Sequence, residues 1–168
     1  MLHARLSTPT KDEATLIKLA GDVKAQLKQP WLAEKAKERM NLLSHILQVL
    51  TAKNKYDIAE DFLQPALNDK SFEENLPAEF TGLRLFYLLV LFEQKRFSEM
   101  EPVIRATKYA LKTKGLENEV SNQLLTFFSA LMRHAPAARQ RAILGQIRKL
   151  LATIPYFRYQ QLGVTSFL

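Results

Sequence analysis

The sequence predicts an all-α fold of about seven helices arranged in antiparallel hairpins. Apolar residues recur at spacings of three and four along most of the chain, which is the period of a helix with one buried face. The chain has only five glycines in 168 residues, and no stretch has the pattern of a convincing strand. Short polar turns separate the periodic stretches, so consecutive helices are expected to lie antiparallel.

The composition indicates one ordinary domain, residues 1–168, that folds by burying apolar side chains. A chain of 168 residues with 47% apolar content can remove roughly 70% of its unfolded surface from water. The absence of cysteine excludes disulfides, thiolate nucleophiles and cysteine-ligated metal centres. It also fits a reducing compartment, and residues 1–11 contain no apolar run of the kind found in secretory signals. We therefore expect a cytoplasmic protein.

The first two helices are predicted at about 11–28 and 30–51. Thr10 and Glu13 have the spacing of a capping box, in which each side chain satisfies the other's backbone amide. Pro30 suits the first turn of the second helix, where its missing N–H has no partner to lose. The second helix carries one apolar stripe: Ala36, Met40, Leu43, Leu47 and Leu50.

A short polar turn at 52–55 joins the second helix to a third, at 56–67, so the first hairpin covers about 30–68. The third helix is expected to bury Ala59, Phe62, Leu63 and Ala66, and Pro65 is expected to bend it or end it early. Polar and acidic residues over 68–76 predict a loop.

The central helix is predicted at about 78–94, opened by Pro77. Nine of the ten residues from 83 to 92 are apolar. A helix over this segment would therefore be apolar on every side and would need other helices packed around it. Ten residues fall far short of the roughly 20 that cross a bilayer. We therefore expect the segment in the core of a protein, with no membrane partner.

A second hairpin, about 77–115, is completed by a helix that follows the turn at 95–97. Ser98 and Glu101 repeat the capping-box spacing, and Gly115 can take the left-handed conformation that closes a helix. The expected buried face of this helix is Met100, Val103, Ile104, Thr107 and Leu111.

A third hairpin is predicted at about 116–154, with helices at 116–134 and 136–154. Pro155 stops the last helix, and the tail 155–168 is expected to fold back on this hairpin. The expected buried residues are Val120, Leu124, Phe127, Phe128, Leu131, Ile143, Ile147, Leu150 and Ile154.

The turn aromatics Tyr56 and Phe97 lie 41 residues apart, which indicates internal repetition. Residues 54–67 resemble the second helix of a tetratricopeptide repeat. In that family an aromatic at the turn is followed by a small residue, a large apolar residue and a second alanine. The residues that fit these places are Tyr56, Ala59, Leu63 and Ala66.

The resemblance weakens along the chain. In the second hairpin Phe97 fits, but Met100 and Thr107 replace the small residues, and the third hairpin keeps little beyond its helical pattern. The 41-residue spacing also exceeds the family's usual 34. As architecture the resemblance covers about residues 36–154, and it implies a curved α-α superhelix that serves as a protein–protein interaction scaffold for peptides or protein surfaces.

If the hairpins stack as in that family, polar helix faces would line the binding groove. The residues on these faces are Asn41, Ser44, Gln48 and Thr51 in the first hairpin and Gln123, Thr126 and Arg133 in the third. Amides and hydroxyls suit hydrogen bonding to a peptide backbone, and an arginine can hold a carboxylate with two hydrogen bonds. The competing interpretation is an ordinary solvated helix face.

The second half of the chain is basic. Residues 81–168 hold 13 Lys/Arg against 5 Asp/Glu, whereas residues 1–80 hold 11 against 12. A basic patch is expected from Arg139, Arg141, Arg148 and Lys149, with Tyr156, Phe157 and Tyr159 as stacking partners. These residues predict a nucleic-acid-associated module as the alternative function. The same cations can instead stabilise the end of a helix as part of a solvated face.

The sequence offers little support for catalysis. His3, His45 and His134 belong to no metal or nucleophile motif, and His45 is expected as a partly buried packing residue. The acidic clusters at 57–61 and 73–74 show no sign of a paired acid and base, and there is no glycine-rich phosphate loop. We therefore expect a non-enzyme without cofactor or metal, whose partner is a protein or peptide; its oligomeric state is not predicted.

Overall fold

The computed structural model describes residues 13–133, 136, 138–139, 141–143, 145–146 and 149. These residues form helices and turns without a strand, so the predicted all-α fold is confirmed. The chain divides into two compact units, Met1–Leu76 and Pro77–Leu168. Throughout the described part, every helix is too short or too polar to span a bilayer.

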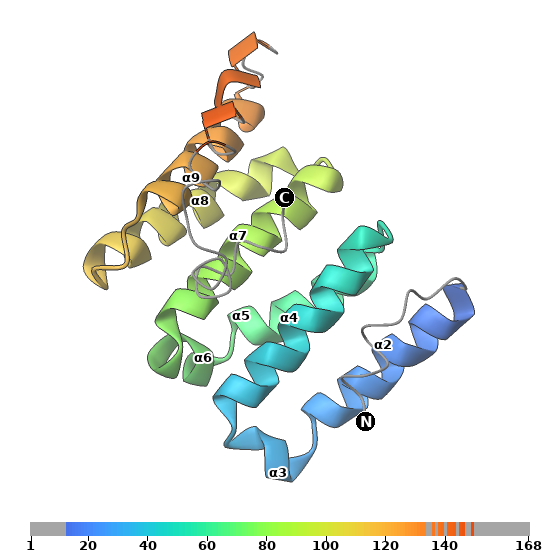
Figure 1. The fold of residues 1–168 in the computed structure, drawn as a ribbon. Helices are drawn as coiled ribbons and strands as arrows, with labels where there is room; N and C mark the ends of the chain where they lie inside the picture. Colours follow the sequence, from blue (N-terminus) through green and yellow to red (C-terminus); the bar gives the residue numbers. More distant parts are fainter. Residues whose placement is uncertain are drawn as a thin grey trace. The chain divides into compact units, whose positions relative to one another are not determined.

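The first unit is built around one central helix (Figure 1). Helix α4 contacts each of the other four helices of this unit, and Ile46, Leu47 and Leu50 on it are fully buried. Four residues of the predicted stripe are buried, namely Met40, Leu43, Leu47 and Leu50, whereas Ala36 is half-buried. Leu42 and Ile46, which the prediction did not include, are buried as well. The helices of this unit are α2 (Glu13–Leu27), α3 (Pro30–Ala33), α4 (Ala36–Ala52), α5 (Tyr56–Leu67) and α6 (Lys70–Asn75).

The prediction of a single helix over 30–51 is wrong, because the helix is interrupted between α3 and α4. Lys35 leaves the helical region, with φ −102° and ψ 69°. The carbonyl of Ala33, at the end of α3, accepts a hydrogen bond from Arg39 Nη1 at 3.2 Å. A side chain from the next helix thus satisfies a backbone group that the break leaves without a helical partner.

The predicted loop at 68–76 is also wrong, since it contains α6. The Asp69 carboxylate caps this helix by accepting a hydrogen bond from the Ser71 amide at 2.9 Å. Phe72 is buried and ties the short helix to the unit. Pro65 does not end α5 early, because the helix runs on to Leu67.

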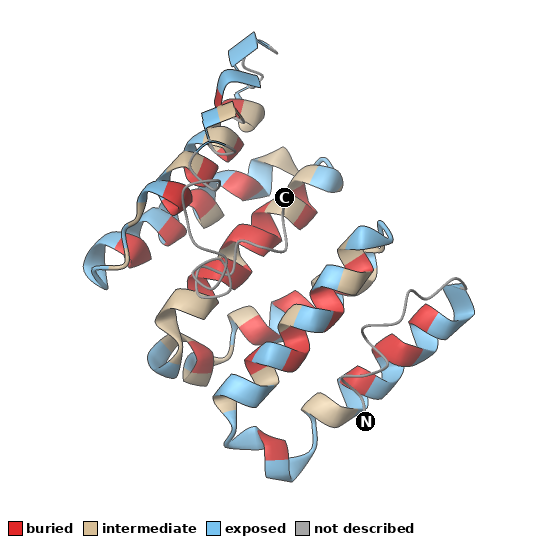
Figure 2. Ribbon diagram, viewed as in Figure 1, coloured by how far each residue is buried: buried red, intermediate tan, exposed pale blue. Residues whose placement is uncertain are grey.

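The second unit contains α7 (Pro77–Glu93), α8 (Phe97–Thr113) and α9 (Glu119–Met132). Helix α8 packs against both α7 and α9, and α7 also contacts α9. The predicted apolar segment, residues 83–92, lies in α7 and is largely buried: Leu88, Val90 and Leu91 have no exposed surface. The buried residues of α7 lie on all sides of the helix and do not form a single stripe (Figure 2).

Two predicted helix starts in this unit are wrong. The capping box of Ser98 and Glu101 does not form, because α8 begins at Phe97 and its N-cap is Arg96. Helix α9 begins at Glu119 and not at 116, because the Asn118 side chain caps it by accepting from the Ser121 amide at 2.9 Å. Gly115 has φ 62° and closes the end of α8 as expected.

Several expectations lie outside the described residues. They are the capping residue Thr10, the histidines His3 and His134, the apolar residues Ile147, Leu150 and Ile154, Arg148, and the whole tail 155–168. Within the predicted helix 136–154, the residues from 138 onward that are described are helical, and Ile143 is buried.

Candidate functional site

The hairpins α4–α5 and α7–α8 share several features, although α5 has 12 residues and α8 has 17. Helices α4 and α7 are both 17 residues long, and the bounds of α7 follow those of α4 by 41 positions. Helices α5 and α8 begin at Tyr56 and Phe97, again 41 positions apart. The spacing seen in the sequence therefore corresponds to equivalent helix ends in the structure.

The turns of the two hairpins also agree in backbone conformation. Asn54 and Lys95 both have positive φ, 55° and 60°. The next residue has φ −93° and ψ 60° at Lys55, and φ −89° and ψ 57° at Arg96. In each turn the aromatic residue follows directly and begins the second helix.

The same pair of backbone hydrogen bonds closes α4 and α7. The Lys55 amide donates to the Leu50 carbonyl at 2.9 Å, and the Arg96 amide donates to the Leu91 carbonyl at 2.8 Å. The Asn54 amide also donates to the Thr51 carbonyl at 2.9 Å, and the Lys95 amide donates to the Phe92 carbonyl at 3.0 Å. Each pair of bonds forms the Schellman pattern of a helix closed by a left-handed residue. Gly115 closes α8 in the same way, but α9 starts later.

The buried faces of α5 and α8 correspond as well. Ala59, Leu63 and Ala66 are buried in α5, and the residues 41 positions later are Met100, Ile104 and Thr107, all buried in α8. The hydroxyl of Thr107 donates to the carbonyl of Val103 at 2.7 Å, so its burial leaves the donor satisfied.

The predicted polar stripe lies along one face of α4. Asn41 and Gln48 are exposed, and Ser44 and Thr51 are half-buried. The Thr51 hydroxyl donates to the carbonyl of Leu47 at 2.9 Å. This face therefore offers mainly two amide side chains and the oxygens of two hydroxyl groups.

The stripe predicted for the third hairpin lies on α9 and at its end. Thr126 is exposed and donates to the carbonyl of Asn122 at 2.8 Å. Gln123 is half-buried, and Arg133 is the exposed C-cap of the helix. These residues belong to the second unit, whereas the α4 stripe belongs to the first.

The predicted basic patch is described in part. Arg139, Arg141 and Lys149 are exposed, whereas Arg148 lies outside the described residues. The aromatic residues expected beside them, Tyr156, Phe157 and Tyr159, also lie outside the described part of the chain.

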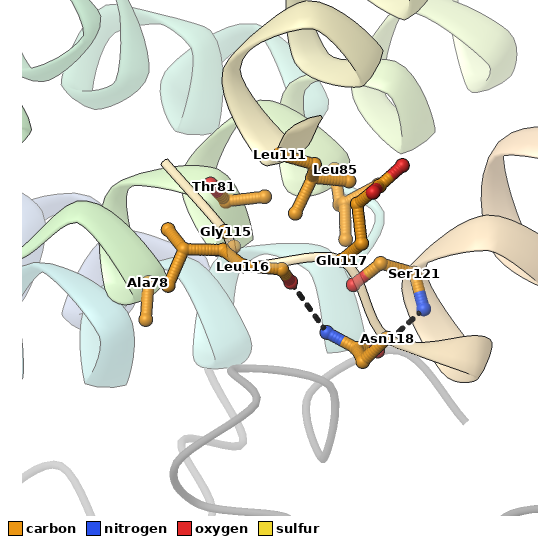
Figure 3. A pocket seen from close by; sticks show the side chains of 10 residues that line it. Ala78, Thr81, Leu85, Leu111, Gly115, Leu116, Glu117, Asn118 and Ser121 are labelled. Carbon is orange, nitrogen blue, oxygen red and sulfur yellow. Dashed lines mark hydrogen bonds between the residues drawn. The ribbon is translucent and has the colours of Figure 1, made fainter. Parts of the chain in front are cut away.

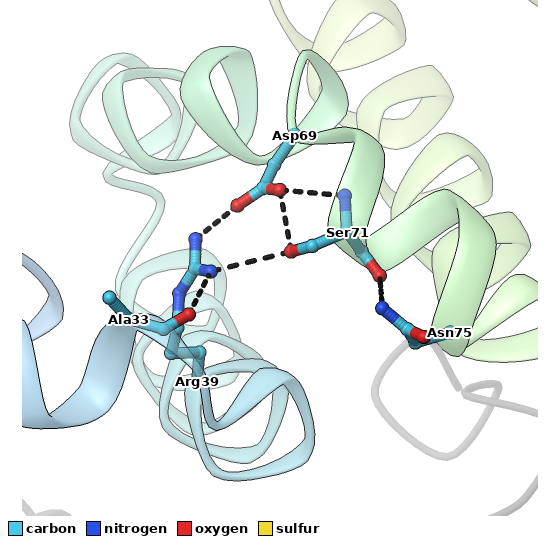
Figure 4. A network of polar contacts seen from close by, with 5 residues as sticks. All are labelled: Ala33, Arg39, Asp69, Ser71 and Asn75. Carbon is cyan, nitrogen blue, oxygen red and sulfur yellow. Dashed lines mark hydrogen bonds and ion pairs between the residues drawn. The ribbon is translucent and has the colours of Figure 1, made fainter.

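A polar network that the sequence did not indicate joins α4 to the start of α6 (Figure 4). Arg39 forms an ion pair with Asp69 and donates to the Ser71 hydroxyl at 3.4 Å. Its guanidinium carbon lies 4.6 Å from the centre of the Phe72 ring. Both charged side chains are about one-fifth exposed, so the network is largely shielded from water.

The pKa of Asp69 lies below its usual value. Burial raises this pKa, but hydrogen bonds from the Ser71 hydroxyl, Arg39 and the Ser71 amide favour the charged form and outweigh burial. The carboxylate is thus held ionised by groups that it also positions, which points to a structural role in capping α6.

A pocket of about 300 Å³ lies in the second unit, where the end of α8 turns toward α9 (Figure 3). Its walls include Thr81 and Leu85 of α7, and Glu117, Asn118 and Ser121 of the turn and α9. The Asn118 side chain is occupied by its bonds to the Leu116 carbonyl and the Ser121 amide. Glu117 is the single carboxylate among the lining residues, so the pocket presents no pair of titratable groups for acid–base chemistry.

His45 is exposed, so its expected role as a packing residue is wrong. Its Nδ1 lies 2.6 Å from the carbonyl of Asn41, and because a carbonyl only accepts, this contact requires the proton on Nδ1. Across the described ranges, no three acidic or histidine side chains converge as a metal site would require.

Comparison of the chain with family models, with curated proteins and with solved structures finds no match.

Proposed function

We propose that the chain is a noncatalytic helical-repeat module that binds a peptide or a protein surface through the polar face of α4. The observation that carries the proposal is the repeated hairpin, in which the bounds of the first helix, the start of the second helix, the turn conformation and three buried positions recur after 41 residues. Arrays of such units expose long helix faces, and those of the tetratricopeptide family, which residues 54–67 resemble, use them to bind peptides. We place the module in the cytoplasm, because its sequence lacks cysteine.

The chemistry of the α4 face supports a peptide ligand. Asn41 and Gln48 are exposed and seven residues apart, so their side chains lie two turns apart on the same side of the helix. Each amide group can both donate and accept, as a peptide backbone also does. Ser44 lies between them on the same side and adds a hydroxyl group.

The alternative function is a nucleic-acid-associated module that uses the basic patch. Arg139, Arg141, Arg148 and Lys149 would attract nucleic acid through its phosphates, and that attraction would weaken strongly with salt. This alternative needs no polar α4 face, so the two functions make different predictions for substitutions in α4.

The experiment compares Gln48→Lys with Gln64→Lys. Both glutamines are exposed on helices of the first unit, and Gln64 lies four residues after Glu60, so the lysine placed there gains a favourable helix pair. A displayed library of random peptides is selected on the wild-type chain, and the affinities of the enriched peptides are measured for all three proteins.

The proposal predicts peptides that bind the wild type and Gln64→Lys equally and bind Gln48→Lys at least about tenfold more weakly, which is the effect of losing one well-placed polar contact. Failure to enrich any peptide would refute it. Equal binding to all three proteins would refute the α4 face as the site.

A further inference from the structure

The outer face of α8 carries the most exposed large apolar side chain in the described residues. Tyr109 is 72% exposed, ahead of Trp31 at 56% and Ile17 at 52%. The opposite face of α8 is buried through Met100, Ile104 and Leu111. Tyr109 is therefore on the side of the helix that the second unit leaves open to solvent.

Cations surround this tyrosine. Arg105 lies four residues before it and Lys112 three residues after it, so both share its side of the helix, and Lys108 flanks them. At 1.5 Å per residue, Arg105 and Lys112 are about 10 Å apart along the helix axis, with Tyr109 between them. All three cations are exposed, and none has an ion-pair partner within the part of the chain that is described.

The positive charge of the surrounding chain adds to the attraction of this face for anionic partners. From Pro102 to Leu116 the sequence contains four cations and no acid. Residues 77–168 hold 13 Lys/Arg and 6 Asp/Glu, whereas residues 1–76 hold 11 of each. The whole net charge of +7 thus lies in the second unit, which raises the local concentration of anionic partners.

We propose that this face, formed by Arg105, Lys108, Tyr109 and Lys112, binds single-stranded nucleic acid without sequence preference. One base stacks on the Tyr109 ring, and Arg105 and Lys112 contact the phosphates on either side of that base. Single strands combine the two features that the face complements, a flat π surface and a repeated negative charge. A duplex hides its base faces in its own stack, so it can use only the cations.

Other occupants fit the face less well. An acidic peptide supplies negative charge but no flat surface for the exposed ring. A second copy of the chain would bring Arg105, Lys108 and Lys112 against the same cations, and like charges oppose that contact. The inference is independent of the peptide-binding proposal, because α8 lies in the second unit and the polar face of α4 lies in the first.

The test measures fluorescence anisotropy of labelled oligonucleotides of one length, single-stranded and double-stranded, at 50 and 200 mM salt. The variants are Tyr109→Ala, Tyr109→Phe and the double change Arg105→Gln/Lys112→Gln. The control is Lys37→Gln/Lys70→Gln, which removes two positive charges from exposed positions in the first unit. Circular dichroism checks that each variant keeps the helical content of the wild type.

The proposal predicts tighter binding to the single strand than to the duplex. Tyr109→Ala should weaken single-strand binding about 5- to 100-fold, and Tyr109→Phe should bind as the wild type does, because the ring is kept. The two phosphate contacts predict about sevenfold weaker binding at 200 mM than at 50 mM salt, and the double variant should remove most of this salt dependence. The control should bind within about twofold of the wild type.

Four results would overturn the proposal. One is a single strand that does not bind at 50 mM salt. Another is equal affinity of Tyr109→Ala and the wild type for the single strand, which would remove the stacking contact. The third is a polyglutamate peptide that displaces the oligonucleotide at equal charge concentration. The fourth is a loss of self-association on Tyr109→Ala in sedimentation. Either of the last two would assign the face to a different partner.

Discussion

The left-handed residue at the α7–α8 turn gives a direct test of the repeated hairpin. Lys95 has φ 60°, a conformation that costs a residue with a Cβ atom about 1–2 kcal/mol. Lys95→Gly removes this cost from the folded state. The greater conformational freedom of glycine in the unfolded chain lowers the free energy of unfolding by about 0.5–1 kcal/mol and so offsets part of the gain. The expected result is a gain of about 0.5–1 kcal/mol in the free energy of unfolding.

The matched control is Lys108→Gly, the same substitution at an exposed position inside α8. Glycine there loses helix propensity, and the free energy of unfolding should fall by about 0.8 kcal/mol. Urea unfolding followed by circular dichroism measures both changes. If Lys95→Gly destabilises the protein as much as Lys108→Gly does, residue 95 is helical and the turn described above does not exist.

Gly115→Ala should destabilise by about 1 kcal/mol through its backbone alone, because φ is 62° and an added Cβ meets no atom within 4 Å. Leu47→Ala and Leu88→Ala, at fully buried positions 41 residues apart, should each cost about 3 kcal/mol in urea unfolding; a cost under about 1 kcal/mol at either site would contradict its burial. Asp69→Asn should cost about 1 kcal/mol at pH 7, because it loses the charge that Arg39 pairs with. The folded-state pKa of Asp69 lies below its unfolded value of about 3.9, so this contribution is complete above about pH 4 and is lost as the pH falls through the folded-state pKa. Unfolding curves of wild type and Asp69→Asn should therefore converge in acid, and a constant difference down to pH 2 would exclude the charge as its source.

Helix type and most core positions follow from sequence periodicity where one face of a helix is buried, although the predicted core residues Val103, Phe127 and Leu131 are only half-buried. The stripe of α4 and the apolar residues of α5 are examples, because spacings of three and four repeat there without interruption. The burial of the apolar segment 83–92 in α7 follows from its composition alone. The 41-residue spacing was also visible, since Tyr56 and Phe97 mark the same place in two turns.

The errors occur at helix ends, where bonds between side chains and nearby backbone groups accompany the local structure. At the break before α4, Arg39 donates to the Ala33 carbonyl, and no glycine or proline marks the break. Helix α6 is short and polar, and its signal is the cap formed by Asp69 and Ser71. Ser98 has a favourable capping partner in sequence, but the turn at Lys95 places it inside the helix.

The candidate site was predictable only in part. The polar stripe of α4 follows from its position opposite the leucines, and the structure leaves Asn41 and Gln48 exposed. The cationic face of α8 was missed, although the sequence contains its signal. Arg105, Tyr109 and Lys112 share a helical spacing of their own, out of phase with the buried stripe that includes Ile104 and Leu111.

Backbone chemical shifts from nuclear magnetic resonance test the repeated hairpin most directly. We expect left-handed backbone shifts at both Asn54 and Lys95, helical shifts over 36–52 and 77–93, and a new helix starting two residues after each left-handed residue. Continuous helical shifts through residue 54 or 95, or strand-like shifts within 83–92, would contradict it.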